Sequence, residues 1–257
     1  MNKLVELYKY RGLLANLVVN ELKLRYRRSF FGFLWTLLNP MLTMAVLTVV
    51  FSTIMRFDMK HYSVLIFSGL LPWIFFSQSI NGSLMSIVGK GSLLKKVYIP
   101  KAVIPLSSVL ATLVNFILSF IPLVIIMAIA GKPLTWAALF LPVSVLLLAL
   151  FACGFAFLFS SLNVFFRDFT HMTEVLLQVL FYLSPVIYTV KLVPEQYQHM
   201  FTWNPLLYLI DMFRTPLYDD RLPDTFNIMV AAGAAFTALF VGFFVFLRSE
   251  KHFVLRV

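Results

Sequence analysis

Long stretches without Asp, Glu, Lys or Arg dominate the chain. Five of them contain 23 to 34 residues each: 29–55, 61–89, 102–131, 133–166 and 225–247. A hydrocarbon core about 30 Å thick is crossed by roughly 20 helical residues, so each stretch is long enough to span a bilayer. The pattern therefore predicts at least five transmembrane helices.

A sixth apolar stretch is shorter. Residues 175–190 carry no charge, and the stretch reaches 22 residues if it begins at Phe169 with Glu174 at the headgroup level. Including it gives an even number of spans and the better distribution of charge across the membrane. We predict an all-α membrane protein with one domain over residues 1–257 and six transmembrane helices, near residues 30–55, 62–88, 102–130, 136–160, 169–190 and 225–247.

The composition agrees with a membrane protein. Of the 257 residues, 61% are hydrophobic and 12% charged, whereas soluble domains average about 45–50% apolar and about 25% charged residues. A soluble globular fold and a disordered chain are both excluded. The single cysteine, Cys153, excludes a disulfide framework and a cysteine-based metal cluster. Gly154 beside it indicates close helix packing in mid-membrane.

The net charge of +10 is unevenly distributed. With six spans, 15 of the 21 Lys and Arg residues fall on the side of both termini, together with five acidic residues, and the other side has six of each sign. The excess of basic residues predicts that both termini are cytoplasmic. Because the basic groups are split among segments that flank spans, nucleic acid is not expected as a partner.

Two segments are not expected to span. Residues 1–28 place Leu14, Val18 and Leu22 at four-residue spacing among basic residues, which predicts an amphipathic interfacial helix; the alternative is a flank that only sets the topology. The external region 191–224 holds four prolines and the short apolar stretch 201–213. That stretch suits re-entrant helices, or an ordered loop anchored by aromatic residues.

Catalytic motifs are scarce. The sequence has neither H-E-x-x-H nor G-x-S-x-G, and Gly89-Lys90-Gly91-Ser92 lacks the spacing of a phosphate-binding loop. We therefore expect a protein that is not an enzyme and that holds no cofactor of its own. Because no charged residue is placed at the bilayer centre, ion coupling is not expected either, and an external energy source is favoured.

Polar side chains at mid-depth are the strongest pointers to a site. Gln78, Asn115 and Tyr182 lie near the centres of their expected spans, and Trp35 lies just inside the first. Lipid cannot satisfy their polar atoms, so each is expected to face another helix or a cavity. Hydrogen bonding between helices and a transport path are equally compatible with this placement.

Several motifs, in order along the whole chain, resemble those of ABC-2-type polysaccharide export permeases, the membrane subunits of O-antigen, capsule or teichoic-acid exporters. They are ELKLRYRRSFFGFLW (21–35), LNPM (38–41), GLLPWIFFS (69–77), KKVYIPK (95–101), LNVFFRD (162–168), SPVIY (184–188) and NPLLYL (204–209). The resemblance implies a homodimer in the bacterial cytoplasmic (inner) membrane, with two copies of a separate ATPase that binds ATP and Mg. It also implies a channel for a lipid-linked polysaccharide between the first and fifth spans, closed outside by a gate in 191–224.

The side chains at mid-depth and the resemblance together suggest residue roles. The substrate path would include Trp35, Gln78, Asn115, Tyr182 and Tyr188, and the external gate Trp203, Asn204, Pro205 and Tyr208. Lys95, Lys96, Tyr98 and Lys101 would meet the ATPase, or form a solvated loop. Arg167 and Asp168 would take part in coupling, and Asp168 is also placed to cap the fifth helix.

Arg25, Arg27 and Arg28 suit the phosphate of a lipid headgroup and equally a role in topology. Two other functions are carried as rivals: an ABC-2 exporter of drugs or small lipids, and a membrane-embedded enzyme that acts on lipids.

Overall fold

The computed structural model describes residues 8–26, 32, 34–50, 61–96 and 98–256, which form helices and turns without a β-strand. Within these residues, four helical segments are long and apolar enough to cross a membrane. They are α4 (Tyr62–Leu84), α7 (Val103–Leu118) continued by α8 (Phe120–Ile129), η2 (Trp136–Phe140) continued by α9 (Leu141–Phe165), and α13 (Thr225–Arg256). The all-helical membrane fold and four of the expected spans are thus confirmed.

The two other expected spans correspond to shorter helices, α3 (Leu34–Val49) and α10 (Phe169–Leu183). Residues 30, 31, 33 and 51–55 of the first expected span lie outside the described residues. The helix α10 ends before the expected residue 190 because Ser184 precedes Pro185 and has an extended backbone, with φ −109° and ψ 141°. Steric conflict with the proline ring disfavours helical geometry at the preceding residue.

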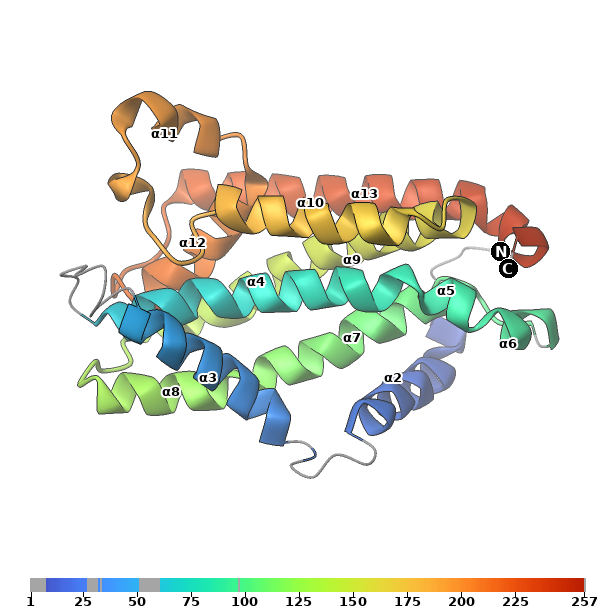
Figure 1. Ribbon diagram of the computed structural model, residues 1–257, viewed down its shortest axis with the longest axis horizontal. Coiled ribbons are helices and arrows are strands. Elements are labelled where there is room, and N and C mark those ends of the chain that lie inside the picture. The colour runs from blue at the N-terminus through green and yellow to red at the C-terminus, as the bar shows by residue number, and fades with distance from the viewer. Residues whose placement is uncertain (1–7, 27–31, 33, 51–60, 97, 257) are drawn as a thin grey trace.

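The helix α4 runs through the middle of the molecule, with α10 and α13 on one side and α2, α3, α7 and α8 on the other (Figure 1). Its most apolar stretch is 78% buried, against 22% for that of α13. A helix enclosed by protein can carry polar groups that bond within it. In α4 the Ser68 and Ser83 hydroxyls donate to the carbonyls of Leu65 and Ile80.

The helices α9 and α13 pack closely along their length. At Gly154 and Gly242 the two backbones come so near that a Cβ on either glycine would overlap the backbone of the other helix. Small residues allow this approach, which lets extensive van der Waals contact form inside a bilayer. The expectation of close helix packing at Gly154 is therefore confirmed.

The helix α2 (Arg11–Tyr26) packs against α7. Leu14, Val18 and Leu22, the expected apolar face, are half-buried, whereas Val19 and Leu24 are exposed. The apolar face thus rests at least partly on protein rather than on lipid. Residues 1–7, 27 and 28 of the expected interfacial helix lie outside the described residues.

The remaining short elements gather at opposite ends of the bundle. The helices α5 (Ser86–Gly89) and α6 (Gly91–Lys96) lie at the same end as the C-terminal turns of α13 (Figure 1). At the other end lie η3 (Val190–Leu192), α11 (Glu195–Phe201) and α12 (Pro205–Leu217). The expected external region is thus built of short helices. We call these the α6 end and the α11 end.

Candidate functional site

A cavity of about 600 Å³ lies among α3, α4, α7 and α10, with Arg25 at the end of α2 on its wall. It brings together four residues that the sequence singled out separately: Arg25, Trp35, Gln78 and Asn115. The other lining residues are Gly32, Asn39, Pro40, Thr43, Leu47, Leu70, Leu71, Trp73, Ile74, Phe75, Thr112, Phe116, Ser119 and Phe181.

The cavity has an exposed mouth and a buried floor. Trp35, Asn39 and Gln78 are exposed, whereas Asn115 is only 6% exposed. Two tryptophans contribute to the wall, and the Trp73 ring lies 5.5 Å from that of Phe181, which links α4 to α10. Amide and hydroxyl groups beside aromatic faces can bind a ligand rich in hydroxyls.

The floor is held in place by hydrogen bonds within α7. The Thr112 hydroxyl donates to the Ser108 carbonyl at 3.0 Å, and the Ser119 hydroxyl donates to the Asn115 carbonyl at 2.8 Å. The α7–α8 junction follows directly, because Pro122 in the first turn of α8 offers no N–H to the preceding turn. Bonds from a hydroxyl to the carbonyl four residues earlier also favour bending there.

Tyr182 and Tyr188, also expected along the substrate path, do not line this cavity. Tyr182 was expected at mid-depth, facing a helix or a cavity, but α10 ends one residue later and the side chain is 64% exposed. The expected position came from extending the helix through Pro185, so the structure corrects it. The Tyr188 hydroxyl donates to the Tyr182 carbonyl at 2.7 Å, which joins the two residues at the α11 end.

The expected gate residues differ widely in burial. Trp203 is 87% exposed, whereas Tyr208 is buried and its hydroxyl donates to the Thr202 carbonyl at 3.1 Å. Asn204 is the N-cap of α12: its side-chain oxygen accepts from the Leu206 N–H at 3.0 Å, and Pro205 occupies the first turn. Both are favoured residue types at a helix start.

A buried arginine fixes the chain that follows α10. Arg214 on α12 is 7% exposed and donates to the carbonyls of Pro185, Val186 and Tyr188. Burial lowers the pKa of Arg214 to about 10, and the nearby Asp211 carboxylate opposes that shift. The guanidinium therefore keeps its charge at neutral pH.

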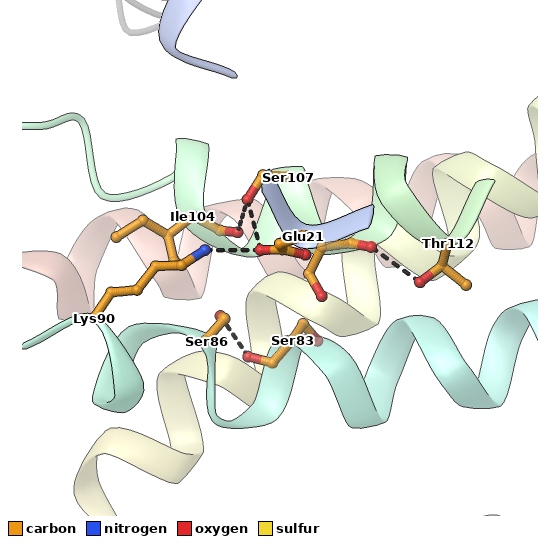
Figure 2. Close-up of polar contacts among 8 residues, drawn as sticks. Glu21, Ser83, Ser86, Lys90, Ile104, Ser107 and Thr112 are labelled. Atoms are coloured by element: carbon orange, nitrogen blue, oxygen red, sulfur yellow. Dashed lines mark hydrogen bonds and ion pairs between the residues drawn. The ribbon is translucent and has the colours of Figure 1, made fainter. Parts of the chain in front are cut away.

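At the α6 end, Glu21 joins three elements (Figure 2). Its carboxylate accepts from the Lys90 ammonium at 2.7 Å and from the Ser107 hydroxyl at 3.1 Å, and both charged side chains are less than one quarter exposed. The Ser86 hydroxyl donates to the Ser83 carbonyl across the break between α4 and α5. The helix α2, the α5–α6 junction and α7 are thus tied together by one carboxylate.

The residues expected to meet an ATPase lie at the same end. Lys95, Lys96 and Tyr98 are exposed, whereas Lys101 donates to the Glu250 carbonyl at 2.5 Å and lies 6.0 Å from the Phe253 ring centre. Lys101 therefore anchors the C-terminal turns of α13.

The expectation that Asp168 caps α10 is wrong. Asp168 occupies the N-cap position, but its backbone is already helical, and its side chain makes no capping hydrogen bond. An N-cap side chain reaches the helix N–H groups from an extended backbone, which is missing here. Asp168 and Arg167 are both exposed, and Arg27 and Arg28 lie outside the described residues.

Comparison with known proteins decides the family. Residues 13–218 match the protein family described as ABC-2 type transporter. The chain belongs to this family. Three relatives of the ABC-2 chain match nearly its whole length. The O-antigen export system permease protein RfbA of Myxococcus xanthus is 38% identical over 251 residues, which is 96% of each chain.

The two other relatives are more distant. A protein of the same name from Klebsiella pneumoniae is 30% identical over 94% of this chain and 93% of its own. The polysialic acid transport protein KpsM of Escherichia coli is 25% identical over 91% of this chain and 92% of its own. The resemblance inferred from the motifs is thus confirmed.

Sequence reasoning missed three residues of this ABC-2 chain that the structure places at junctions: Glu21, Lys90 and Arg214. Arg214 was counted only as a charge on one side of the membrane. Glu21 was noted otherwise only as the start of the motif 21–35, and Lys90 only within a sequence that lacks the spacing of a phosphate-binding loop. Arg214 gave a local signal, because it directly follows the apolar stretch 201–213, in which Asp211 is the only charged residue. Glu21 and Lys90 gave no such signal, because Glu21 lies 69 residues before Lys90 and 86 residues before Ser107, its two hydrogen-bond partners.

Proposed function

We propose that this chain is the membrane subunit of an ATP-driven exporter that moves a lipid-linked polysaccharide outward across the bacterial cytoplasmic membrane. The observation that carries the proposal is its match over 96% of its length to an O-antigen export permease. The motifs from which the resemblance was first inferred are spread over the same length.

The cavity among α3, α4, α7 and α10 supports this function. Asn39 and Gln78 at its mouth are exposed amides, and amide groups facing lipid would lose their hydrogen bonds. The mouth therefore faces water or a second protomer. A homodimer that joins two such mouths would form a path with aromatic and polar walls, where Arg25 would meet the phosphate of the lipid carrier.

The proposal extends to topology and energy source. In it, the first span runs through α3 and the fifth through α10, giving six spans with both termini cytoplasmic, and α11 and α12 form a re-entrant external gate. The α6 end then faces the cytoplasm, where two ATPase subunits that bind ATP and Mg push on α2 and on residues 90–101. Because the Glu21 carboxylate on α2 binds Lys90, a push on either α2 or residues 90–101 would move both.

Transport of a labelled lipid-linked oligosaccharide by the chain and its partner ATPase in liposomes tests the proposal. Gln78→Leu removes one hydrogen-bonding group from the cavity, and one such bond is worth about 1 kcal/mol, or about fivefold in rate. Asn81→Leu is the matched control, because Asn81 is also an exposed amide of α4 but does not line the cavity.

We expect transport to slow with Gln78→Leu and to stay unchanged with Asn81→Leu. Transport of drugs or small lipids, with the glycan left behind, would instead establish the first rival. ATP hydrolysis or lipid turnover by the purified chain alone would contradict the proposal altogether.

A further inference from the structure

The buried Arg214 makes all its described hydrogen bonds to one five-residue segment. Its Nη2 donates to the carbonyls of Pro185 at 2.7 Å and Val186 at 2.9 Å, and its Nη1 donates to the carbonyl of Tyr188 at 3.1 Å. These acceptors lie in residues 184–188, which we call the strap, directly after the end of α10. One side chain of α12 thus binds three backbone groups of the strap.

The same helix also holds the start of the strap. Asn204, the N-cap of α12, donates from Nδ2 to the Leu183 carbonyl at 3.1 Å and to the Ser184 hydroxyl at 2.9 Å. The strap therefore runs alongside α12 and is bound to it by Asn204 at one end and by Arg214 at the other.

The opposite side of the strap lies against α4. The Tyr62 hydroxyl donates to the Ile187 carbonyl at 3.0 Å. At Gly69 a Cβ would lie 2.7 Å from Nη2 of Arg214 and would overlap the Val186 carbonyl, so only glycine fits there. The strap is thus enclosed between two helices, and most of the bonds use its backbone carbonyls.

By contrast, α10 itself is weakly held. Only Thr173 and Leu177 of this helix are buried, and Val175, Leu176 and Val179 are exposed. The strap is therefore the firm connection between α10 and α12. A planar guanidinium can bind several carbonyls in fixed directions, which an ammonium group cannot do.

We propose that Arg214 is a positioning residue that holds α11 and α12 closed against α4 and makes α12 move together with α10 when the pathway opens. This inference rests on the proposed function, because it assigns the role of gate to α11 and α12. In this role the buried arginine does more than pack: it transmits movement of α10 to the gate formed by α11 and α12.

The experiment measures leakage through the closed pathway. The chain and its partner ATPase are reconstituted in liposomes that contain a small fluorescent solute, and passive efflux is followed without ATP. Three variants are compared with the wild type: Arg214→Met, Arg214→Lys and Arg221→Met. Arg221 is the matched control, since its side chain is 60% exposed and its ion pair with Asp224 is long, at 3.7 Å.

We expect Arg214→Met to raise passive efflux at least about tenfold, because each lost bond to a charged donor is worth about a factor of ten or more. Arg214→Lys should give an intermediate rise, and Arg221→Met none. Gly69→Ala, which keeps the arginine but pushes the Val186 carbonyl away from it, should also raise efflux.

The inference would be overturned if Arg214→Met and Gly69→Ala leaked no faster than the wild type, although their complexes with the ATPase eluted like the wild-type complex in size-exclusion chromatography. A merely structural role would reduce the yield of complex without opening a leak in the complex that forms. The assay needs neither ATP nor glycan, so a wild-type complex that fails to export glycan would contradict the proposed function while leaving the Arg214 result interpretable.

Discussion

The contact between α9 and α13 gives a sharp prediction at Gly242. A Cβ at this position would lie 2.7 Å from the carbonyl carbon and 3.0 Å from the Cα of Gly154, and would overlap the carbonyl oxygen. Carbon atoms prefer separations of about 3.5–4.0 Å, so Gly242→Ala must push the two helices apart. Because the opposing atoms are backbone, no side-chain rotation can relieve the overlap.

The same helix offers a matched control. At Gly233 of α13 a Cβ would meet nothing within 4 Å. Gly233→Ala should therefore stabilise the helix by about 0.5–1 kcal/mol through lower backbone entropy in the unfolded chain. Gly242→Ala gains the same entropy term but loses about 1–3 kcal/mol or more to overpacking.

Thermal unfolding of the purified chain in detergent, followed by tryptophan fluorescence, measures the difference. The shared entropy term cancels, so the two variants differ by the overpacking cost alone. We expect the midpoint for Gly242→Ala to lie below that for Gly233→Ala by about 2–12 °C, at roughly 2–4 °C per kcal/mol for a chain of this size. An equal or higher midpoint for Gly242→Ala would refute the close approach of α9 and α13.

Three further predictions concern the junctions. Glu21→Lys should lower the unfolding midpoint by placing two cations together, and adding Lys90→Glu should restore it; no recovery in the double variant would contradict the ion pair. Asn204→Ala should cost about 1 kcal/mol from the lost N-cap, seen as a lower midpoint and as faster hydrogen exchange in the first turn of α12. Asp220→Ala should destabilise more than Lys132→Met in chemical unfolding, because Lys132 is 8% exposed and pairs with the more exposed Asp220 at 2.7 Å, so the first variant strands a buried charge.

Several features could be predicted because they depend on local pattern. The four long spans follow from runs of apolar residues, and α12 follows from Asn204 and Pro205 in the order that a helix start prefers. The close packing at Gly154 was expected from a small residue in mid-span, although its partner Gly242 lies 88 residues later and was not predicted.

Predictions from the sequence were wrong where the backbone geometry at one residue outweighs the composition of the segment around it. Residues 184–190 are apolar enough to continue a span, but the backbone geometry that Pro185 imposes on Ser184 ends α10 at Leu183. Asp168 stands at the N-cap but leaves the capping bond unmade because its backbone is helical rather than extended. In both cases backbone dihedral angles decided the outcome.

By itself the sequence determined that the protein is embedded in a membrane, which apolar stretches are long enough to cross it, and to which family the chain belongs. These depend on quantities read along the chain: apolar length against bilayer thickness, the distribution of Lys and Arg, and motif order. Only the tertiary structure decided which polar groups meet. The cavity joins Arg25, Trp35, Gln78 and Asn115, and Arg214 finds its three carbonyls. Arg214 and Asn115 are buried, and a buried polar group requires a hydrogen-bond partner, which the packing of distant helices brings within reach. The exposed Arg25, Trp35 and Gln78 come together because the helices that carry them surround one cavity.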